Sequence, residues 1–300
     1  MAKQRCLLIF VLFILLLAGC STGGQTNAKE AAADNNDPED NRIISTTVAV
    51  TEIMDALELD LIGVPTSYKE LPERYDGLPE VGNPMGPDME LLLSLQPKKV
   101  ISVTTLKSDL DSIFTNAGVD ATYMNLESMD DMLAGIEALG KEFDREEQAT
   151  KIVGDFEAKV AAMKEKTAGK ESPSVLILMG VPGSYLVATD QSYLGDLVSK
   201  AGGNNVFSGE KVEYLASNTE HLQQTNPDII LRTAHGMPDE VVKMFDREFK
   251  ENDIWKHFSA VTNDRVYDLK EPLFGTTGNL RVGEALDVLY DIFYNEADAN

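Results

Sequence analysis

A single long amphipathic helix near the middle of the mature chain constrains the fold most. Between Asp144 and Ala168, apolar residues recur at helical spacing along one stripe, at Ala149, Ile152, Val153, Phe156, Val160 and Met163. Asp144 with Glu147 gives a capping-box-like start, and Gly169 is placed to end the helix. At 1.5 Å per residue the helix would be about 37 Å long. Its length and position indicate a rigid connector between two halves, and a long helix within one domain is the alternative.

Short apolar runs and helical patterns alternate on both sides of this helix. The expected strands are Thr46–Val50, Leu61–Val64, Lys98–Val103, Val175–Met179, Asp228–Arg232 and Arg265–Leu269. The expected helices are Asp88–Leu95, Lys107–Ala117, Met129–Leu139, Tyr193–Ala201, Asp239–Phe249 and Arg281–Tyr294. This alternation predicts mainly parallel sheets with helices on their faces. We therefore expect two α/β lobes, residues 43–143 and 170–300, joined by the single helix at 144–169.

The first twenty residues have the layout of an export signal. Lys3 and Arg5 precede an apolar run, Leu7–Leu17, that is too short to span a bilayer as a helix. The run closes in Leu-Ala-Gly-Cys, which is typical of a lipobox whose cysteine thiol receives a lipid. We expect a signal peptide over 1–19 and a lipid anchor at Cys20. The alternative is an ordinary signal peptide, or a signal anchor, that contains a chance cysteine.

The only other cysteine supports the lipobox interpretation. Cys6 lies inside the expected signal, so Cys20 is the only mature cysteine of the two in the sequence. An intramolecular disulfide is then impossible, and a cysteine-ligated metal site is disfavoured. Residues 21–42 contain almost nothing that could form a core, so we expect 20–42 to be a flexible tether between lipid and fold.

Charge and motif content exclude several classes of function. The formal net charge of −24 argues against nucleic acid and against anionic lipid surfaces, so the membrane contact is expected to be the lipid anchor alone. His221, His235 and His257 lie far apart, and the chain has no G-x-S-x-G, P-loop or H-E-x-x-H motif. We therefore expect no enzymatic activity. A metal-dependent surface enzyme is the alternative from another class.

Two loops carry unusual residues, and the first contains Met85. If Gly86 caps the next helix and Pro87 is its first residue, a hydrophobic residue at 85 would normally pack on the fourth helical position. That position is Glu90, so Met85 lacks its usual local partner and is a candidate for a ligand-binding cleft. On this observation alone, a core-filling role for Met85 is favoured.

The second loop, Arg232–Pro238, follows an expected strand and leads into an expected helix. Loops at the carboxyl ends of strands are where open α/β sheets bind ligands. Within this loop, His235 stands between Ala234 and Gly236 and has little to pack against. A ligand role and a structural role for His235 are equally supported by these residues.

Four long stretches resemble a known family: VGNPMGPDMELLLSLQPKKVISVTTL, LMGVPGSYLVATDQSYLGDLV, YLASNTEHLQQTNPDIILRTAHGMPDEVVKMF and NDIWKHFSAVTNDRVYDL. They are similar to the periplasmic-type binding proteins that serve iron-siderophore, cobalamin and haem importers, in which one long helix joins two α/β lobes. More narrowly, they resemble the haem-receptor lipoproteins of the iron-regulated surface determinant system. With the lipobox, the resemblance covers nearly the whole chain beyond the tether.

The resemblance implies haem b as the ligand, with its iron held by Met85 in NPMGPDME and His235 in AHGMPDE. A thioether and an imidazole together can fill both axial positions of haem iron. Iron with six ligands has no position left for oxygen or substrate, which suits transport and argues against catalysis. Met89 and Met237 are neighbouring alternatives for the sulfur ligand, and their simpler role is to pack against the porphyrin or the core. His221 and His257 are interpreted as non-ligands.

The resemblance also implies two acidic residues, Glu90 and Glu220, that dock into basic pockets of an ABC permease. Each has a simpler explanation, because Glu90 lies in a first helical turn and Glu220 forms a capping box with Ser217. The expected function is capture of haem at the outer face of the cytoplasmic membrane. Upstream haem-relay surface proteins would supply the haem, and the permease would receive it for iron acquisition.

A ferric siderophore or a corrinoid is the alternative cargo for the same fold. Such a cargo is already chelated and would not need both Met85 and His235. An anionic siderophore would also require arginine or lysine side chains in the cleft. A Soret band in the purified protein would separate haem binding from these alternatives.

Overall fold

The computed structural model describes residues 42–217, 222 and 224–295. The expected signal peptide, Cys20 and almost all of the tether lie outside the described residues, as do Glu220 and His221. The described chain forms two α/β lobes, one before and one after the long helix α5 (Glu146–Thr167). The fold class expected from the alternating pattern is therefore confirmed.

The first lobe is built on a three-stranded parallel sheet. Its strands, in spatial order, are β1 (Ile43–Ser45), β4 (Lys99–Val103) and β5 (Ala121–Met124). Its helices are α1 (Val48–Ala56), η1 (Glu73–Tyr75), α2 (Met89–Ser94), η2 (Thr104–Leu106), α3 (Lys107–Asn116) and α4 (Met129–Glu142). A separate antiparallel hairpin of β2 (Gly82–Asn83) and β3 (Gly86–Pro87) precedes α2. This hairpin carries the first of the two candidate loops.

The second lobe contains a six-stranded mixed sheet. The path through the sheet is β11 (Val266–Leu269), β10 (Ile229–Ala234), β6 (Ser174–Val181), β7 (Ser184–Ala188) and β9 (Tyr214–Ala216), with β8 (Asn204–Asn205) also on β6. The pairs β10–β11, β10–β6 and β6–β8 are parallel, whereas β6–β7 and β7–β9 are antiparallel. Its helices are α6 (Tyr193–Lys200), α8 (Pro238–Glu251), η3 (Trp255–His257), α9 (Ser259–Thr262) and α10 (Val282–Tyr294).

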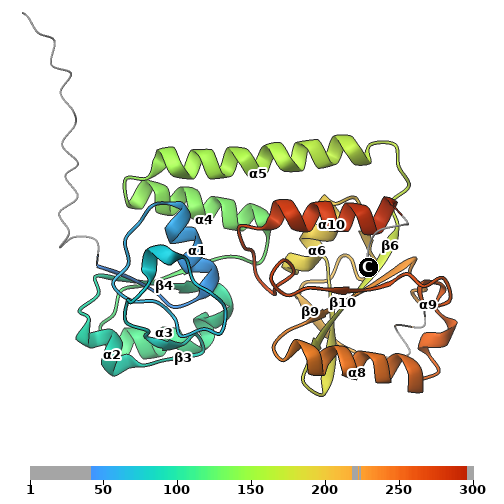
Figure 1. Ribbon diagram of the computed structural model, residues 1–300, viewed down its shortest axis with the longest axis horizontal. Helices are drawn as coiled ribbons and strands as arrows, with labels where there is room; N and C mark the ends of the chain where they lie inside the picture. Colours follow the sequence, from blue (N-terminus) through green and yellow to red (C-terminus); the bar gives the residue numbers. More distant parts are fainter. Residues whose placement is uncertain (1–41, 218–221, 223, 296–300) are drawn as a thin grey trace, which may run out of the picture. The chain divides into compact units, whose positions relative to one another are not determined.

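Helix α5 connects the two lobes and packs on both. It contacts α4 of the first lobe and both α6 and α10 of the second, and Figure 1 shows it running along α4 and α10. Its buried residues Ala149, Val153 and Met163 belong to one core cluster with residues of both lobes. The Lys159 ammonium lies 2.5 Å from the Asp287 carboxylate of α10. This packing fixes α5 against helices of both lobes.

The helix boundaries agree with the expected helix over 144–168, but its start differs in detail. The first helical residue is Glu146, the preceding cap residue is Arg145, and no side chain caps this end. Asp144 instead has a positive φ of 55°, which takes it out of the helix and rules out the expected capping box. Gly169, with φ of 75°, follows the last turn as expected for a helix-ending glycine.

The expected strand over Thr46–Val50 is wrong. The strand at this place is the preceding β1, and Thr47 begins helix α1, because its side-chain oxygen accepts a hydrogen bond from the Val50 amide. Val50, Ile53 and Met54 are then buried at helical spacing. The β-branched residues of this segment favour a strand by composition. The threonine cap and the burial of one helical face outweigh that preference, and the segment is helical.

The expected strand over Leu61–Val64 is also wrong as a regular strand. This segment makes only isolated bridges, from Gly63 to Ile44 and from Val64 to Glu80. A side chain at Gly63 would meet the Val81 side chain at 3.0 Å, so neighbouring side chains pack directly against this backbone. The other four expected strands correspond to β4, β6, β10 and β11 within one to two residues at each end.

Candidate ligand-binding site

Met85 lies at the tip of the β2–β3 hairpin. The hairpin pairs Gly82 with Pro87 and Asn83 with Gly86, so Pro84 and Met85 form the two-residue turn. The Asn83 side-chain oxygen accepts a hydrogen bond from the Met85 amide at 2.9 Å and braces this turn. The Met85 side chain is 71% exposed, so it is not a core residue. The core-filling interpretation of Met85 is thus wrong, and its thioether is available to a ligand.

The local reason for this placement differs from the expected one. Asp88, and not Gly86, caps helix α2, since its carboxylate accepts a hydrogen bond from the Leu91 amide at 3.0 Å. Gly86 and Pro87 belong to β3 instead. Gly82 has φ of 98°, and a side chain there would meet the Asp88 backbone nitrogen at 2.8 Å. Glycine is therefore required for the hairpin that presents Met85.

His235 follows directly on the buried strand β10. Its backbone amide still donates to the Gly180 carbonyl of β6 at 2.8 Å, so its position is fixed by the sheet, while the residue as a whole is exposed. Gly236 and Met237 then adopt positive φ, and Pro238 begins helix α8. His235 is the first of three residues between strand β10 and helix α8, at the carboxyl end of a parallel strand.

The neighbouring methionines and the other histidine take different positions. Met89 is half-buried against the cluster formed by Ile44 and Leu92, so its packing role accounts for it. Met237 is 53% exposed, two residues from His235. His257 lies in the short helix η3 and is exposed.

Arg232 belongs to the second candidate loop by sequence but is a buried part of β10. Its guanidinium lies 2.8 Å and 2.5 Å from the two carboxylate oxygens of Asp268 and 3.0 Å from Asp246. It also stacks over the Phe249 ring at 5.1 Å. Because two carboxylates already neutralise this charge, Arg232 is not a free cation for an anionic ligand.

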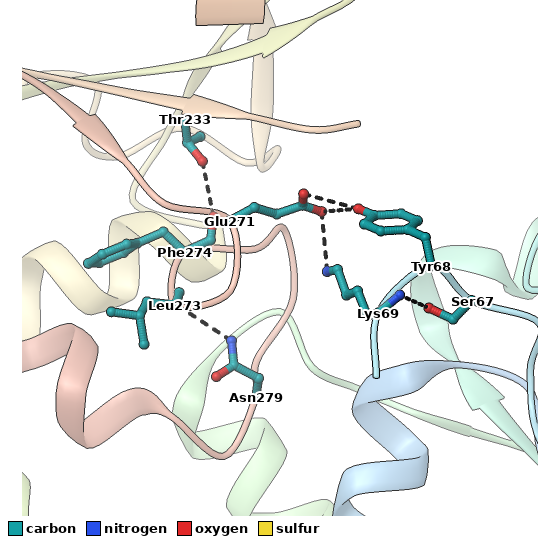
Figure 2. Close-up of polar contacts among 8 residues, drawn as sticks. All are labelled: Ser67, Tyr68, Lys69, Thr233, Glu271, Leu273, Phe274 and Asn279. Atoms are coloured by element: carbon teal, nitrogen blue, oxygen red, sulfur yellow. Dashed lines mark hydrogen bonds and ion pairs between the residues drawn. The ribbon is translucent and has the colours of Figure 1, made fainter. Parts of the chain in front are cut away.

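Two further loops, one from each lobe, contact each other in Figure 2. The Tyr68 hydroxyl of the first lobe donates to the Glu271 carboxylate of the second, at 3.1 Å from both oxygens. The Lys69 ammonium lies 3.2 Å from the same carboxylate. The sequence gives no signal for these three residues, because Glu271 lies about 200 positions after Tyr68 and Lys69 and no local motif connects them.

The expected docking residue Glu90 lies in the first turn of α2 and is exposed. Its carboxylate is thus available to a partner and also favoured there by the helix dipole.

Within the described part of the chain, no group of three or more histidine, cysteine, aspartate or glutamate side chains could hold a metal ion. No described helix is both long and apolar enough to cross a bilayer.

Glu213, in the loop before β9, is a carboxylic acid whose ionised form is destabilised by its surroundings. Burial raises the pKa of Glu213 to about 7, and the negative charge of Glu127 in the other lobe adds to the shift. One Glu213 carboxylate oxygen is buried and has no hydrogen-bond partner in the described structure. At neutral pH a charged Glu213 is therefore unfavourable in the folded protein.

We expect the free energy of unfolding to fall as pH rises from about 4.5 to 7. In that window the native protein holds a proton on Glu213 that the unfolded chain has released, so stability is present at low pH and lost above the native pKa. Glu213→Gln should flatten this dependence and stabilise the protein by about 1–2 kcal/mol at pH 8. Urea unfolding at pH 5 and pH 8 measures this. The exposed Glu171→Gln is the control, and equal pH dependence in both variants would contradict the prediction.

The chain is similar to proteins of known type along nearly its whole length. A family model described as periplasmic binding protein matches residues 43–273. The chain is 45% identical over 292 residues to the high-affinity heme uptake system protein IsdE of Staphylococcus aureus, covering 97% of each. An ABC transporter substrate-binding protein from Listeria monocytogenes has 55% identity and a TM-score of 0.82, over 85% of this chain and 99% of that one. The structure of S. aureus IsdE complexed with heme has 49% identity and a TM-score of 0.81, over 84% and 98%.

Proposed function

The chain belongs to the periplasmic binding protein family, and from this premise we propose that it is a receptor that captures haem and delivers it to an ABC permease for iron acquisition. The relative IsdE of S. aureus is a high-affinity heme uptake system protein, and its solved structure is complexed with heme. The protein acts by binding and transfer and not as an enzyme.

The presentation of Met85 and His235 carries this proposal. One exposed thioether and one exposed imidazole stand on tight turns, one from each lobe, and each turn is fixed by backbone hydrogen bonds. These two groups would hold the iron of haem b from its two faces, because together they satisfy both axial positions. Iron ligated in this way has no open position, which favours carriage over chemistry.

The same residues disfavour an anionic siderophore as cargo. Arg232, the arginine nearest His235 in the sequence, is buried and neutralised by Asp268 and Asp246. A chelated ferric siderophore or a corrinoid would also leave Met85 and His235 without a role. Haem therefore accounts for more of the site than either alternative.

Titration of the purified protein with haemin tests the proposal. A Soret band with the features of low-spin, six-coordinate iron is expected at one haem per chain. Ferric siderophores and aquocobalamin are the comparison ligands, because proteins of this fold also carry them. If the protein binds either of these in preference to haemin, or gives no Soret shift, the proposed cargo is wrong.

We further propose that the receptor is held at the outer face of the cytoplasmic membrane by a lipid on Cys20. The division of the chain is then signal peptide 1–19, tether 20–42, first lobe 43–143, connecting helix 144–169 and second lobe 170–300. Cell-surface proteins upstream would donate the haem. The acidic net charge of −24 keeps the anchor as the sole membrane contact.

Cys20→Ser should release folded, haem-competent protein into the medium, because Cys20 is the only mature thiol that can carry the lipid. Fractionation of cells into membrane and medium, with haem binding measured in each fraction, checks this. Cys6→Ser is the matched control, since Cys6 lies in the segment expected to be removed. A Cys20→Ser protein that stays with the membrane would mean that the apolar segment itself is the anchor.

A further inference from the structure

The contact of Tyr68 and Lys69 with Glu271 joins loops of the two lobes, and we name these three residues the clasp. The Glu271 side chain is only 13% exposed, while that of Lys69 is 38% exposed. A hydroxyl donor and an ammonium group therefore share one largely shielded carboxylate, as Figure 2 shows. Hydrogen bonds to an ionised acceptor are stronger than those between neutral groups.

On the first-lobe side, the segment that precedes Tyr68 and Lys69 is bonded to the hairpin that presents Met85. The Thr66 amide donates to the Gly82 carbonyl of β2 at 2.9 Å. The Val81 amide also donates to the Val64 carbonyl at 2.8 Å. The Lys69 amide donates to the Ser67 hydroxyl at 2.9 Å, which fixes the local turn. We therefore expect a displacement of this loop to reach the Met85 hairpin through these backbone bonds.

On the second-lobe side, the loop that contains Glu271 is bonded to the strand that presents His235. Thr233 of β10 pairs with Leu269 of β11, and Glu271 follows two residues later. The Thr233 hydroxyl also donates to the Phe274 carbonyl at 3.0 Å, which returns the loop to β10 (Figure 2). The loop is closed by the amides of Leu273 and Phe274, which both donate to the Lys270 carbonyl. Glu271 is thus fixed to the strand end that precedes His235.

We infer that Tyr68, Lys69 and Glu271 are positioning residues that set the placement of Met85 relative to His235. This inference depends on the proposed function, because it assigns those two residues to haem iron. Two ligands on opposite faces of one porphyrin must keep a fixed separation for both bonds to form. If the loops move independently, the weaker thioether bond is the first to be lost.

The clasp is not needed to hold the lobes together. Helix α5 packs on both lobes. At the junction of α4 and α6, the Met129 amide donates to the Asp196 carboxylate at 2.9 Å and Lys200 lies 3.3 Å from Asp130. Removing the clasp should therefore leave the melting temperature nearly unchanged and act locally on the two turns.

Glu271→Gln and Tyr68→Phe test the inference with ferric haem and with iron-free protoporphyrin IX. Each variant should lower the low-spin fraction of the haem complex and raise the haem dissociation rate about three- to tenfold. Dissociation of protoporphyrin IX should not change, because it makes no axial bonds. In the ligand-free variants, amide hydrogen exchange should rise in residues 82–87 and 235–237.

Asp60→Asn is the matched control, since it removes the same charge from an ion pair of 2.8 Å with Arg74 that stays within the first lobe. It should reproduce the wild-type spectrum and rates. If the clasp variants also match the wild type, or if protoporphyrin IX dissociates faster by the same factor, the positioning role is wrong. If the wild-type protein forms no low-spin haem complex at all, the proposed function itself fails, which is a distinct result.

Discussion

His235→Ala is expected to cause the largest loss of haem retention of any single change in the candidate site. Imidazole is the stronger iron donor in both oxidation states, whereas a thioether favours ferrous iron. Loss of a group that merely supports a metal ligand costs about 10- to 100-fold in affinity, so loss of His235 itself should raise the haem dissociation rate at least about 100-fold. The spectrum should lose its low-spin features because the nitrogen ligand is gone. Stopped-flow transfer of haem to an acceptor protein measures the rate.

Met85→Ala should have a smaller effect of a different kind. The iron should become five-coordinate or water-ligated, and the Soret band and the ferrous spectrum should shift while haem stays bound. Apolar surfaces around a bound porphyrin would contribute to affinity independently of the metal bond, so both variants should retain measurable binding. Met85 is exposed on a hairpin tip, and its replacement should not affect folding.

Three controls decide whether the two ligands are assigned correctly: Met89→Ala, Met237→Ala and His257→Ala. Met89 packs against the core, Met237 neighbours His235, and His257 lies in another element. All three should leave the low-spin spectrum nearly unchanged. If Met85→Ala and His235→Ala both reproduce the wild-type spectrum, the iron is held elsewhere or haem is not the cargo. A changed spectrum in Met237→Ala alone would move the sulfur ligand to the second lobe.

Regular patterns made the larger features of the fold predictable from sequence. The stripe along 144–168 predicts α5 to within two residues, because every buried position of that helix lies on one face. Strand β6 is an almost continuous apolar run and β10 begins with Ile-Ile-Leu, which is typical of strands covered on both faces. The antiparallel strands β7 and β9 were missed, since they are half-exposed and contain no alternating run of useful length.

The two candidate loops were found for different reasons. The His235 loop could be placed from the strand before it and the proline after it, and the structure has both. The Met85 loop was selected on a wrong local argument, because Asp88 and not Gly86 caps α2. The clasp had no sequence signal, since the contact of Tyr68 with Glu271 depends on how two lobes meet. Long-range polar contacts of this kind follow only from the folded structure.

Charge reversal of the two proposed docking residues, Glu90→Lys with Glu220→Lys, is expected to abolish haem uptake while haem binding stays intact. If each carboxylate enters a basic pocket of the permease, a lysine there meets a like charge and leaves the pocket unpaired. Truncating one partner of such a pair costs roughly 2–5 kcal/mol, so delivery should fall by more than about tenfold. Glu90 is exposed on the first turn of α2, and Glu220 lies outside the described residues. Uptake of labelled haem by whole cells, beside haem titration of the purified variant, gives both readouts.

The competing explanation is that Glu90 only stabilises its helix, and a matched variant separates the two roles. Asp109 is an exposed acid in the first turn of α3 in the same lobe, so Asp109→Lys has the same unfavourable interaction with a helix N-terminus, about 1 kcal/mol or less. If docking is the role of Glu90, Asp109→Lys should transport normally although its stability falls equally. If Glu90→Lys and Asp109→Lys transport equally well, Glu90 is a helix-stabilising residue and the permease contacts another surface. The same conclusion follows if transport by both variants falls only in proportion to their stability. High salt should weaken the wild-type complex with the permease only in the first case, because exposed ion pairs are screened.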